Sequence, residues 1–339
     1  MGDDWVTVGI DNGGTANNGT VLDADGRFLV DRLAELPSLV REGPDRAIPA
    51  LVESFESMLE LTGVSRDRVR AVGLDTPGPA SAAGVLAAGG AVNFGHPAWS
   101  RFDIRGALEE RLGIPVLYNN DGNAATLYAH SVRFGAEPGK HGSVSAIIGT
   151  GFGGGVITDG RIVTGAAGFA GELGHMPIQM TGLLEAGQPV PSCACGLAGD
   201  SESVASLTGI QRNLLPYWLT RYPDHELAAV PVEKGAKLVR GYAERGDAMA
   251  LNIFRQQAMA IGRVFSLAAK FTDPDAYFVG GGVIETEPHF RDWFLGVVRE
   301  NTELYPEQAE VAEIALVPDL DMAGARGSAI AAAQWSERK

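Results

Sequence analysis

Two short glycine-rich segments carry residue types that bind phosphate through the backbone. Each follows an apolar segment, at residues 5–10 and 143–148. A glycine-rich turn between two strands exposes consecutive N–H groups, which hold phosphate oxygens without a cationic side chain. The carboxylate of the first turn could hold the hydration shell of Mg²⁺. The turns consist of Asp11, Asn12, Gly13, Gly14 and Thr15 and of Gly149, Thr150 and Gly151.

One such turn alone is more typical of a plain hairpin, but two of them, each after an apolar strand, favour a phosphate site. Neither turn has the G-x-x-x-x-G-K-[ST] pattern of a P-loop, and neither is a G-x-G-x-x-G that opens a helix. The sequence therefore argues against P-loop enzymes and Rossmann dehydrogenases.

Asp121 stands between an expected strand at residues 114–118 and an Ala-rich helical segment at residues 123–134. A carboxylate at such a junction can act as a general base that takes the proton of an attacking hydroxyl group. Aspartate at a helix start is also a common N-cap, which is the more frequent role for an isolated residue. Both roles remain open on the residues alone.

His175, Cys193 and Cys195 are the residue types that bind Zn²⁺ in a tetrahedral site. The chain has two cysteines, two positions apart, which is not a disulfide framework. The alternative is a reduced cysteine pair in a polar loop, without metal.

The pattern of elements predicts an α/β protein with an internal repeat. A strand, glycine-rich turn and further strand occur near residue 11 and again near residue 149, each followed by helices, which predicts two similar lobes. The expected strands are 5–10, 19–22, 27–30, 70–74, 114–118, 143–148, 156–158, 161–164, 275–279 and 312–317. Helical patterns cover 51–59, closed by Gly63, and 123–134, 201–271, 287–300 and 323–335.

Composition limits the partners of the chain, which has 339 residues and a net charge of −15. There is no basic stretch, so nucleic acid and anionic membranes are not expected as partners. No apolar run approaches the roughly 20 residues that span a bilayer, and no signal peptide is visible. We expect a cytoplasmic protein.

Taken together, these residues resemble the ROK (repressor, open reading frame, kinase) family of sugar kinases, which includes bacterial glucokinases. The resemblance runs nearly end to end. Besides the two phosphate turns, it rests on five further segments. These are Thr76-Pro77-Gly78-Pro79 followed by Asn93, Asn120-Asp121, Gly171-Glu172-Leu173-Gly174-His175, Cys193-Ala194-Cys195-Gly196 and Gly280-Gly281-Gly282.

The resemblance implies a two-lobed actin-like, ribonuclease-H-like ATPase fold with a duplicated β-meander plus helices. We expect a small N-terminal lobe at residues 1–118 and a large lobe at 119–319, which carries the sugar and metal loop. The final helix, about 320–337, would pack back on the first lobe. Family resemblance also indicates a homodimer.

The resemblance further implies transfer of the γ-phosphoryl group of ATP, with Mg²⁺, to a sugar hydroxyl, commonly the 6-hydroxyl of glucose, with Asp121 as general base. The sugar would contact Asn93, Asn120, Asp121, Glu172, His175 and Glu202. ATP would contact Asp11, Asn12, Gly13, Gly14, Thr15, Gly149, Thr150, Gly151, Gly280, Gly281 and Gly282. Structural Zn²⁺ would be held by His175, Cys193, Cys195 and Asp200.

The chain departs from the family pattern at a few positions. Asp200 replaces the third cysteine of Cys-x-Cys-Gly-x-x-Gly-Cys-x-Glu, and Ala16 replaces a lysine that commonly follows Gly-Gly-Thr. A carboxylate can bind zinc, although less selectively than a thiolate. These departures leave an amino sugar or a cyclitol as alternative acceptors.

Two functions of other classes are weighed against the kinase. A ROK transcriptional regulator would carry an additional helix-turn-helix domain, whereas here the first strand starts at about Trp5 and the net charge is −15. A catalytically inactive sugar-binding module is disfavoured by the presence of Asp11, Asp121 and both glycine turns.

Overall fold

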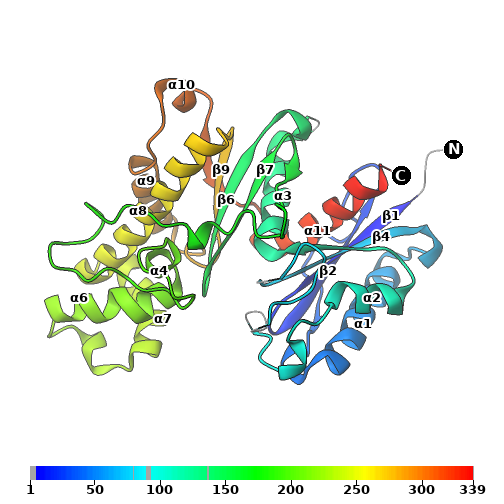
Figure 1. Cartoon of the computed structure of the whole chain (residues 1–339), viewed down its shortest axis with the longest axis horizontal. Helices are drawn as coiled ribbons and strands as arrows, with labels where there is room; N and C mark the ends of the chain where they lie inside the picture. Colours follow the sequence, from blue (N-terminus) through cyan, green and yellow to red (C-terminus); the bar gives the residue numbers. More distant parts are fainter. Residues whose placement is uncertain (1–4, 79, 89–92, 136, 339) are drawn as a thin grey trace. The chain divides into compact units, whose positions relative to one another are not determined.

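The computed structural model describes residues 5–78, 80–88, 93–135 and 137–338. The chain divides into two compact units (Figure 1). Unit 1 comprises residues 1–140, 155–171 and 317–339, and unit 2 comprises residues 141–154 and 172–316. The expected lobe boundary after residue 118 stays a prediction.

Strands and helices are intermixed along the chain, with three consecutive strands near the start of each sheet. The strands are β1 Val6–Asn12, β2 Ala16–Asp23, β3 Glu35–Pro37, β4 Val69–Thr76, β5 Val116–Asn120, β6 Ser143–Ile148, β7 Phe152–Thr158, β8 Arg161–Ile162, β9 Ala276–Gly280 and β10 Glu313–Leu316. The helices are α1 Pro44–Thr62, α2 Ile104–Leu112, α3 Asp121–Phe134, α4 Glu202–Ala205, α5 Leu207–Gly209, α6 Leu215–Arg221, α7 Val232–Glu244, α8 Ala248–Phe271, α9 Pro288–Glu300, α10 Pro306–Ala309 and α11 Leu320–Ser336.

The two sheets repeat one strand order, which confirms the predicted duplication. The first sheet runs β3-β2-β1-β4-β5, and the second, read from its other edge, runs β8-β7-β6-β9-β10. In each case three consecutive strands lie side by side, and two later strands extend the sheet beside the first of the three. In the first sheet β4 and β5 run parallel to β1, and in the second β9 and β10 run parallel to β6.

One expected strand is wrong. Residues 27–30 do not form the third strand of the first meander, because Phe28 makes only an isolated bridge to Leu22 before the chain leaves the sheet. The third strand is β3, which pairs with residues 16–18 at the other end of β2. The turn signal at residues 23–26 was therefore correct, but the strand after it was assigned too early.

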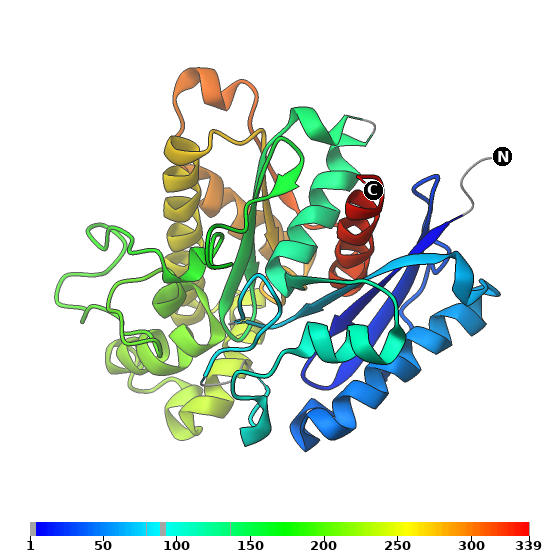
Figure 2. The same cartoon turned by 45° about the vertical axis from the view of Figure 1, so that its right-hand side comes forward.

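Strand β1 is buried on both faces, with alternate side chains on opposite sides, as a pleated strand requires. Val6, Val8 and Ile10 join the apolar cluster formed with α1. On the opposite face, Thr7 donates a hydrogen bond to the carbonyl oxygen of Ala329 in α11 (2.9 Å). The final helix thus packs on the first sheet within unit 1 (Figure 2).

Glycine allows α11 to lie directly against the strands. A Cβ atom on Gly9 of β1 would lie 1.9 Å from the carbonyl oxygen of Ala325, and one on Gly73 of β4 would lie 1.9 Å from that of Ser328. Both distances are far inside van der Waals contact. The helix can occupy this position only because neither strand carries a side chain there.

Helix α1 shows how local sequence sets an element. Pro44 occupies its first turn, where the missing N–H is not needed, and Gly63 ends it in the left-handed conformation with φ 67°. Leu51, Phe55 and Met58 recur at helical spacing and are buried. The predicted helix is confirmed and begins earlier than the pattern indicated.

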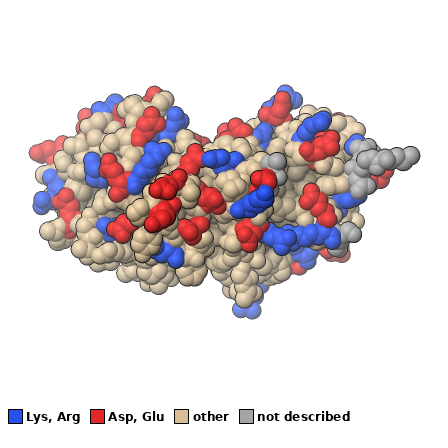
Figure 3. Space-filling model, turned by 90° about the horizontal axis from the view of Figure 1, so that it is seen from above, with Lys and Arg blue, Asp and Glu red and all other residues tan. Residues whose placement is uncertain are grey.

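In unit 2, the long helix α8 packs against β6 and against α4, α7 and α9. On the face drawn in Figure 3, Lys and Arg side chains are interspersed with Asp and Glu. Among the described residues, no helix combines the length and the apolar character that crossing a membrane requires.

We predict that Gly9→Ala lowers the free energy of unfolding by about 1–3 kcal/mol, the usual cost of overpacking, because its methyl group would displace α11. Thermal or urea unfolding measures the loss. The control is Gly139→Ala in the same unit, where a Cβ atom meets nothing within 4 Å. Equal stability of the two variants would contradict the close approach.

Candidate active site

The candidate residues of unit 1 lie at the carboxyl ends of neighbouring parallel strands. Asp11 of β1 pairs in register with Asp75 of β4, and Asp75 pairs with Asn119 of β5. One residue further, Thr76 pairs with Asn120, directly before Asp121. Ligands of open α/β sheets bind outside the carboxyl ends of strands. Register therefore brings the first glycine turn and the Asn-Asp pair to one edge.

The first glycine turn is a tight connection between β1 and β2. The amide of Gly13 donates to the carbonyl oxygen of Ala16 (2.9 Å), and Thr15 is exposed. Asn12 is fully buried, and its amide donates to Asn17 Oδ1 (2.5 Å). The side chain of Asn12 therefore holds the hairpin, so only its backbone remains for a phosphate.

Asn93 lies against this turn. A Cβ atom on Gly14 would come within 2.6 Å of the Asn93 side chain. Asn93 is exposed, and its backbone has the positive φ of 69°. The structure thus brings the sugar-loop asparagine of the sequence prediction beside the phosphate turn. Pro79, which belongs to the same predicted motif, and residues 89–92, which precede Asn93, lie outside the described residues.

Asp11 and Asp75 are buried carboxyl groups that influence each other's ionisation, and Ser328 Oγ of α11 donates to Asp75 Oδ2 (2.7 Å). Burial raises the pKa of Asp75 well above its usual value, and the negative charge of Asp11 raises it further. Burial also raises the pKa of Asp11, against the lowering effect of the bond from Asp75. Two adjacent carboxylates cannot readily both ionise, so Asp75 carries the shared proton and leaves the charge on Asp11.

Asn120, not Asp121, is the N-cap of α3. The side-chain oxygen of Asn120 accepts from the amide of Gly122 (2.9 Å), and Asp121 Oδ1 accepts from the same amide (2.7 Å). Asp121 is the first residue of the helix. The common capping role is thus performed by its neighbour, and the carboxylate of Asp121 acts on Asp75 as a nearby negative charge.

In unit 2, two glycine turns lie side by side because they follow neighbouring parallel strands that end at the same edge of the sheet. Strands β6 and β9 are parallel, with Ile147 opposite Gly280, so the turns that follow them meet. Gly281 has φ 88°, and a Cβ atom there would lie 2.2 Å from the carbonyl oxygen of Ile148. Only glycine allows this contact between the predicted second phosphate turn and the Gly280–Gly282 turn.

Backbone amides of α5 hydrogen-bond to the second glycine turn. The amides of Leu207 and Thr208 donate to the carbonyl oxygens of Gly149 (3.0 Å) and Thr150 (3.1 Å). The amide of Gly149 in turn donates to the carbonyl oxygen of Gly151 (3.0 Å). The carbonyl oxygens of all three turn residues therefore accept backbone hydrogen bonds, and the amide of Gly149 is also used, so an anion would need the amides of Thr150 and Gly151.

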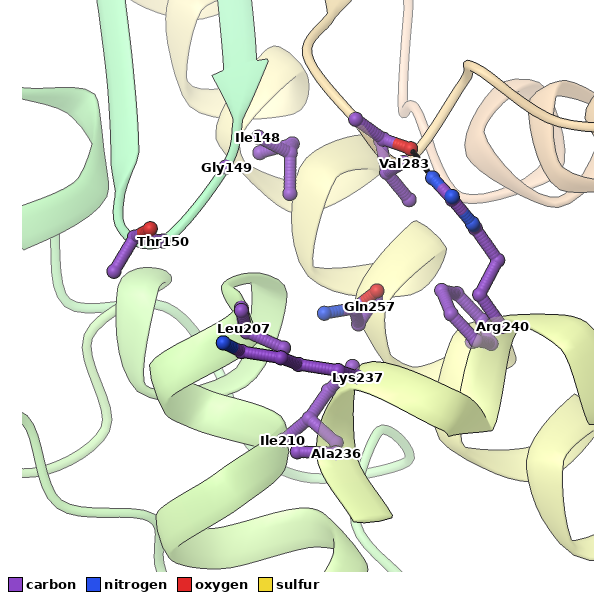
Figure 4. Close-up of a pocket in the computed structure, with 12 residues that line it drawn as sticks. Ile148, Gly149, Thr150, Leu207, Ile210, Ala236, Lys237, Arg240, Gln257 and Val283 are labelled. Carbon is purple, nitrogen blue, oxygen red and sulfur yellow. Dashed lines mark hydrogen bonds between the residues drawn. The ribbon is translucent and has the colours of Figure 1, made fainter. Parts of the chain in front are cut away.

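A cavity of about 300 Å³ opens beside these turns, entirely within unit 2 (Figure 4). Its walls are mainly apolar, and its polar side chains are Thr150 of the turn, Lys237 and Arg240 of α7 and Gln257 of α8. Arg240 Nη1 donates to the carbonyl oxygen of Gly282 (2.6 Å) and so fixes the third glycine turn. Lys237 extends across the cavity toward the side of Thr150 (Figure 4).

His175, Cys193, Cys195 and Asp200 form a cluster, with one ligand atom from each lying within 4.8 Å of all the others. Asp200 Oδ2 is 3.2 Å from His175 Nδ1 and 3.6 Å from Cys195 Sγ, and Cys193 Sγ is 3.8 Å from His175 Nδ1. Tetrahedral zinc with bonds of about 2.0–2.3 Å requires ligand atoms about 3.3–3.8 Å apart. The donor set and its spacing therefore fit zinc.

The carboxylate that replaces the third cysteine is well prepared for this role. Asp200 is fully buried, and its other oxygen accepts from the amide of Ser203 (2.9 Å), which orients the side chain. Such outer contacts are typical of metal ligands.

Glu202 connects the cluster to the second glycine turn. Its Oε2 accepts from the amide of Phe152 (2.9 Å), and its Oε1 lies 3.4 Å from Cys193 Sγ. Glu172 directly precedes the 3-10 turn that contains His175. Burial raises the pKa of Glu172, His175 lowers it, and the charge of Glu202 raises it. The predicted sugar-binding residues of unit 2 thus lie around one cluster.

The sequence also matches known proteins. The model of the ROK family matches residues 7–335. The chain belongs to the ROK family. A glucokinase of Halalkalibacterium halodurans is 31% identical over 319 residues, which cover 92% of this chain and 90% of that protein.

Solved structures of ROK proteins share the fold. A ROK hexokinase from Thermus thermophilus has a TM-score of 0.77 and 30% identity, covering 99% of this chain and 100% of the other. A ROK family glucokinase from Streptomyces griseus, solved with glucose and AMPPNP, has a TM-score of 0.69 and 27% identity, covering 97% and 99%. This ROK chain thus has the expected actin-like ATPase fold.

Sequence reasoning missed two features of this ROK protein. Asp75 directly follows the expected strand at residues 70–74 and was given no role, because its pairing with Asp11 is visible only in the register of the folded sheet. The cavity walls from α7 and α8, which include Lys237 and Gln257, gave no signal because they form an ordinary helical pattern.

We predict that Asp75→Asn stabilises the protein increasingly as pH rises. An unfolded aspartate ionises near pH 4, whereas folded Asp75 keeps its proton to a higher pH, so the wild type loses stability through this interval. Asparagine removes the titration yet keeps the shape. We expect its Tm advantage to be at least about 2 °C larger at pH 8 than at pH 5, measured without added Mg²⁺.

The matched control for this titration is Asp31→Asn, a change at an exposed aspartate of the same unit. It should leave the pH dependence of Tm unchanged. A gap between Asp75→Asn and wild type that stays constant from pH 5 to pH 8 would refute the protonated state of Asp75.

Proposed function

We propose that this chain is an ATP-dependent sugar kinase that phosphorylates the 6-hydroxyl of glucose or a related hexose. The observation that carries the proposal is the shared strand edge of unit 1, where Asp121 follows β5 and the first glycine turn follows β1, with β4 between the two strands. Phosphoryl transfer needs a base for the acceptor and a site for the phosphates, and this edge supplies both kinds of group. The glucokinase and ROK hexokinase relatives support the same activity.

Asp121 is the proposed general base. Its carboxylate takes the proton of the attacking hydroxyl group, the resulting oxygen forms a bond to the γ-phosphorus, and ADP leaves with the electrons of the broken bond. Asn120 caps α3 and so fixes the backbone from which Asp121 projects. Asn120 and Asn93 are proposed to hold sugar hydroxyls with their amides.

The phosphates of ATP are proposed to bind through the amides of the two glycine turns, because neither turn carries a cationic side chain. Mg²⁺ would neutralise the transferring phosphoryl group, and Asp11 is the residue that would hold its water shell. The shared proton on Asp75 keeps the negative charge on Asp11, where a cation can use it.

The sugar is proposed to contact Glu172, His175 and Glu202 in unit 2. His175 turns Nδ1 toward Asp200 and Cys193, so Nε2 is the nitrogen that would meet a hydroxyl group. Zinc bound to the cluster would supply structure, by holding His175 and the loop of the two cysteines in place. The homodimer and the cytoplasmic location remain predictions from sequence.

We predict that Asp121→Asn lowers kcat by roughly 10²–10⁴-fold while leaving glucose affinity nearly unchanged, because the amide keeps its hydrogen bonds but accepts no proton. ADP release measures turnover, and calorimetry measures binding. As a control, Asp45→Asn changes another first-turn aspartate of unit 1, in α1, and should keep wild-type kcat.

The acceptor is tested in the same assay with hexoses, amino sugars and cyclitols. Glucose should be turned over, and 6-deoxyglucose should compete with it without releasing ADP. ADP release from 6-deoxyglucose would refute the 6-hydroxyl, and near wild-type turnover by Asp121→Asn would refute the base.

We predict about one zinc ion per chain in protein purified without chelators, because one ligand atom from each of the four donors lies within 4.8 Å of the others. Cys195→Ser should lower zinc content and Tm together, whereas Asp224→Asn, an exposed acid of the same unit, should change neither. Elemental analysis checks the content. Fully active, zinc-free protein would reject the site.

A further inference from the structure

The cavity of unit 2 has one polar group in its depth. Gln257 of α8 lines the cavity and is 1% exposed, while apolar side chains such as Ile148, Leu207 and Val283 form the surrounding walls. Gly149 and Thr150 line the same cavity, so it extends from the second glycine turn into the unit (Figure 4). A ligand that enters with a phosphate at the turn would meet Gln257 with its other end.

The orientation of the Gln257 amide is fixed by its surroundings. Its Nε2 lies 3.2 Å from the backbone carbonyl oxygen of Ser206. A carbonyl oxygen only accepts hydrogen bonds, so the nitrogen must face Ser206 and the oxygen must face the other way. Figure 4 shows the nitrogen on the side of Leu207 and the oxygen turned away from it.

The oxygen of this amide has no partner in the described part of the chain. Oε1 of Gln257 is buried and accepts no hydrogen bond from any described residue. A buried acceptor left without a donor costs about 1–3 kcal/mol. The side chain is therefore arranged to accept from a donor that a ligand brings into the cavity.

We propose that Gln257 Oε1 selects the nucleobase of the phosphoryl donor by accepting a hydrogen bond from its exocyclic amino group. The inference rests on the proposed kinase function and adds the residue that recognises the base. Adenine carries an amino group at C6, which satisfies Oε1. Hypoxanthine carries a carbonyl oxygen there, so two acceptors would face each other and neither would be satisfied.

The positive charge of Lys237 at the cavity favours a ligand that carries phosphate groups, that is, a nucleotide rather than a nucleoside. Lys237 extends from α7 toward the Thr150 side of the cavity (Figure 4), where the phosphates would lie. The interior beyond it has no described cationic lining residue other than Arg240, which is bound to the carbonyl oxygen of Gly282. The apolar walls suit a planar base, and the charged mouth suits its phosphates.

The test compares ATP with purine riboside triphosphate, which lacks the amino group, and with inosine triphosphate. The wild type should prefer ATP over purine riboside triphosphate by about 5–150-fold in kcat/KM, the ratio that corresponds to one satisfied acceptor. Gln257→Met, which keeps the volume but loses the oxygen, should lower kcat/KM for ATP and leave the analogue nearly unchanged. The preference should then fall to about one.

The matched control is Gln256→Met, a change at the adjacent buried amide. Gln256 bonds to Gln188, Trp218 and Leu183, not to the cavity. This variant should lose stability and keep the ATP preference, which separates base recognition from loss of a buried amide. The proposal is wrong if Gln257→Met keeps the preference for ATP over purine riboside triphosphate, or if the wild type uses these two nucleotides equally.

The result also separates this inference from the kinase proposal. Equilibrium binding of ADP, IDP and purine riboside diphosphate to the same variants reports on Gln257 without any sugar. Absence of turnover with every acceptor would defeat the kinase proposal, while an ADP preference that disappears in Gln257→Met would still support the base contact. Equal binding of the three diphosphates by the wild type would overturn it.

Discussion

The close approach of α11 to β1 and β4 is the contact on which unit 1 depends. The last helix of the chain lies so near the first sheet that the carbonyl oxygens of Ala325 and Ser328 occupy the space of two missing side chains. The same approach brings Ser328 Oγ to Asp75. Burial raises the pKa of Asp75 and the charge of Asp11 raises it further, whereas the hydrogen bond from Ser328 lowers it. A packing constraint between distant parts of the sequence thus becomes an electrostatic property of the strand edge.

The parallel register of the strands brings the functional turns together. In both sheets, strands from well-separated parts of the chain end next to each other, so loops that are remote in sequence become neighbours. The first sheet gathers carboxyl and amide side chains at its edge, whereas the second gathers glycine turns and a cavity. One duplicated topology therefore supports two kinds of chemistry, because the residues after the strands differ.

Buried polar groups are unusually informative in this protein, since each must be satisfied by a partner. Asp75 accepts a hydrogen bond from Ser328 through Oδ2, and Asp200 is oriented by a backbone amide toward the other members of its cluster. Gln257 keeps an acceptor that no described residue satisfies. The first two show how neighbouring donors orient buried carboxyl groups, and the third indicates where a ligand completes the structure.

The sequence alone determined the features that depend on local pattern. Strand and helix periodicity, the glycine turns and the spacing of His175, Cys193 and Cys195 were sufficient for the α/β class, the duplication and the family. The metal cluster was also anticipated, although the family resemblance was needed to include Asp200. Local signals failed at residues 27–30, because strand pairing is decided by the partner strand and not by β propensity.

Only the tertiary structure decided which residues meet. The protonated Asp75, the capping of α3 by Asn120 in place of Asp121, and the cavity with Gln257 arise from register and helix packing across long sequence separations. An aspartate in a strand or a glutamine in a helix has the same local pattern whether it faces solvent, core or ligand. Its surroundings, and hence its charge and unused hydrogen-bonding capacity, exist only once the chain has folded.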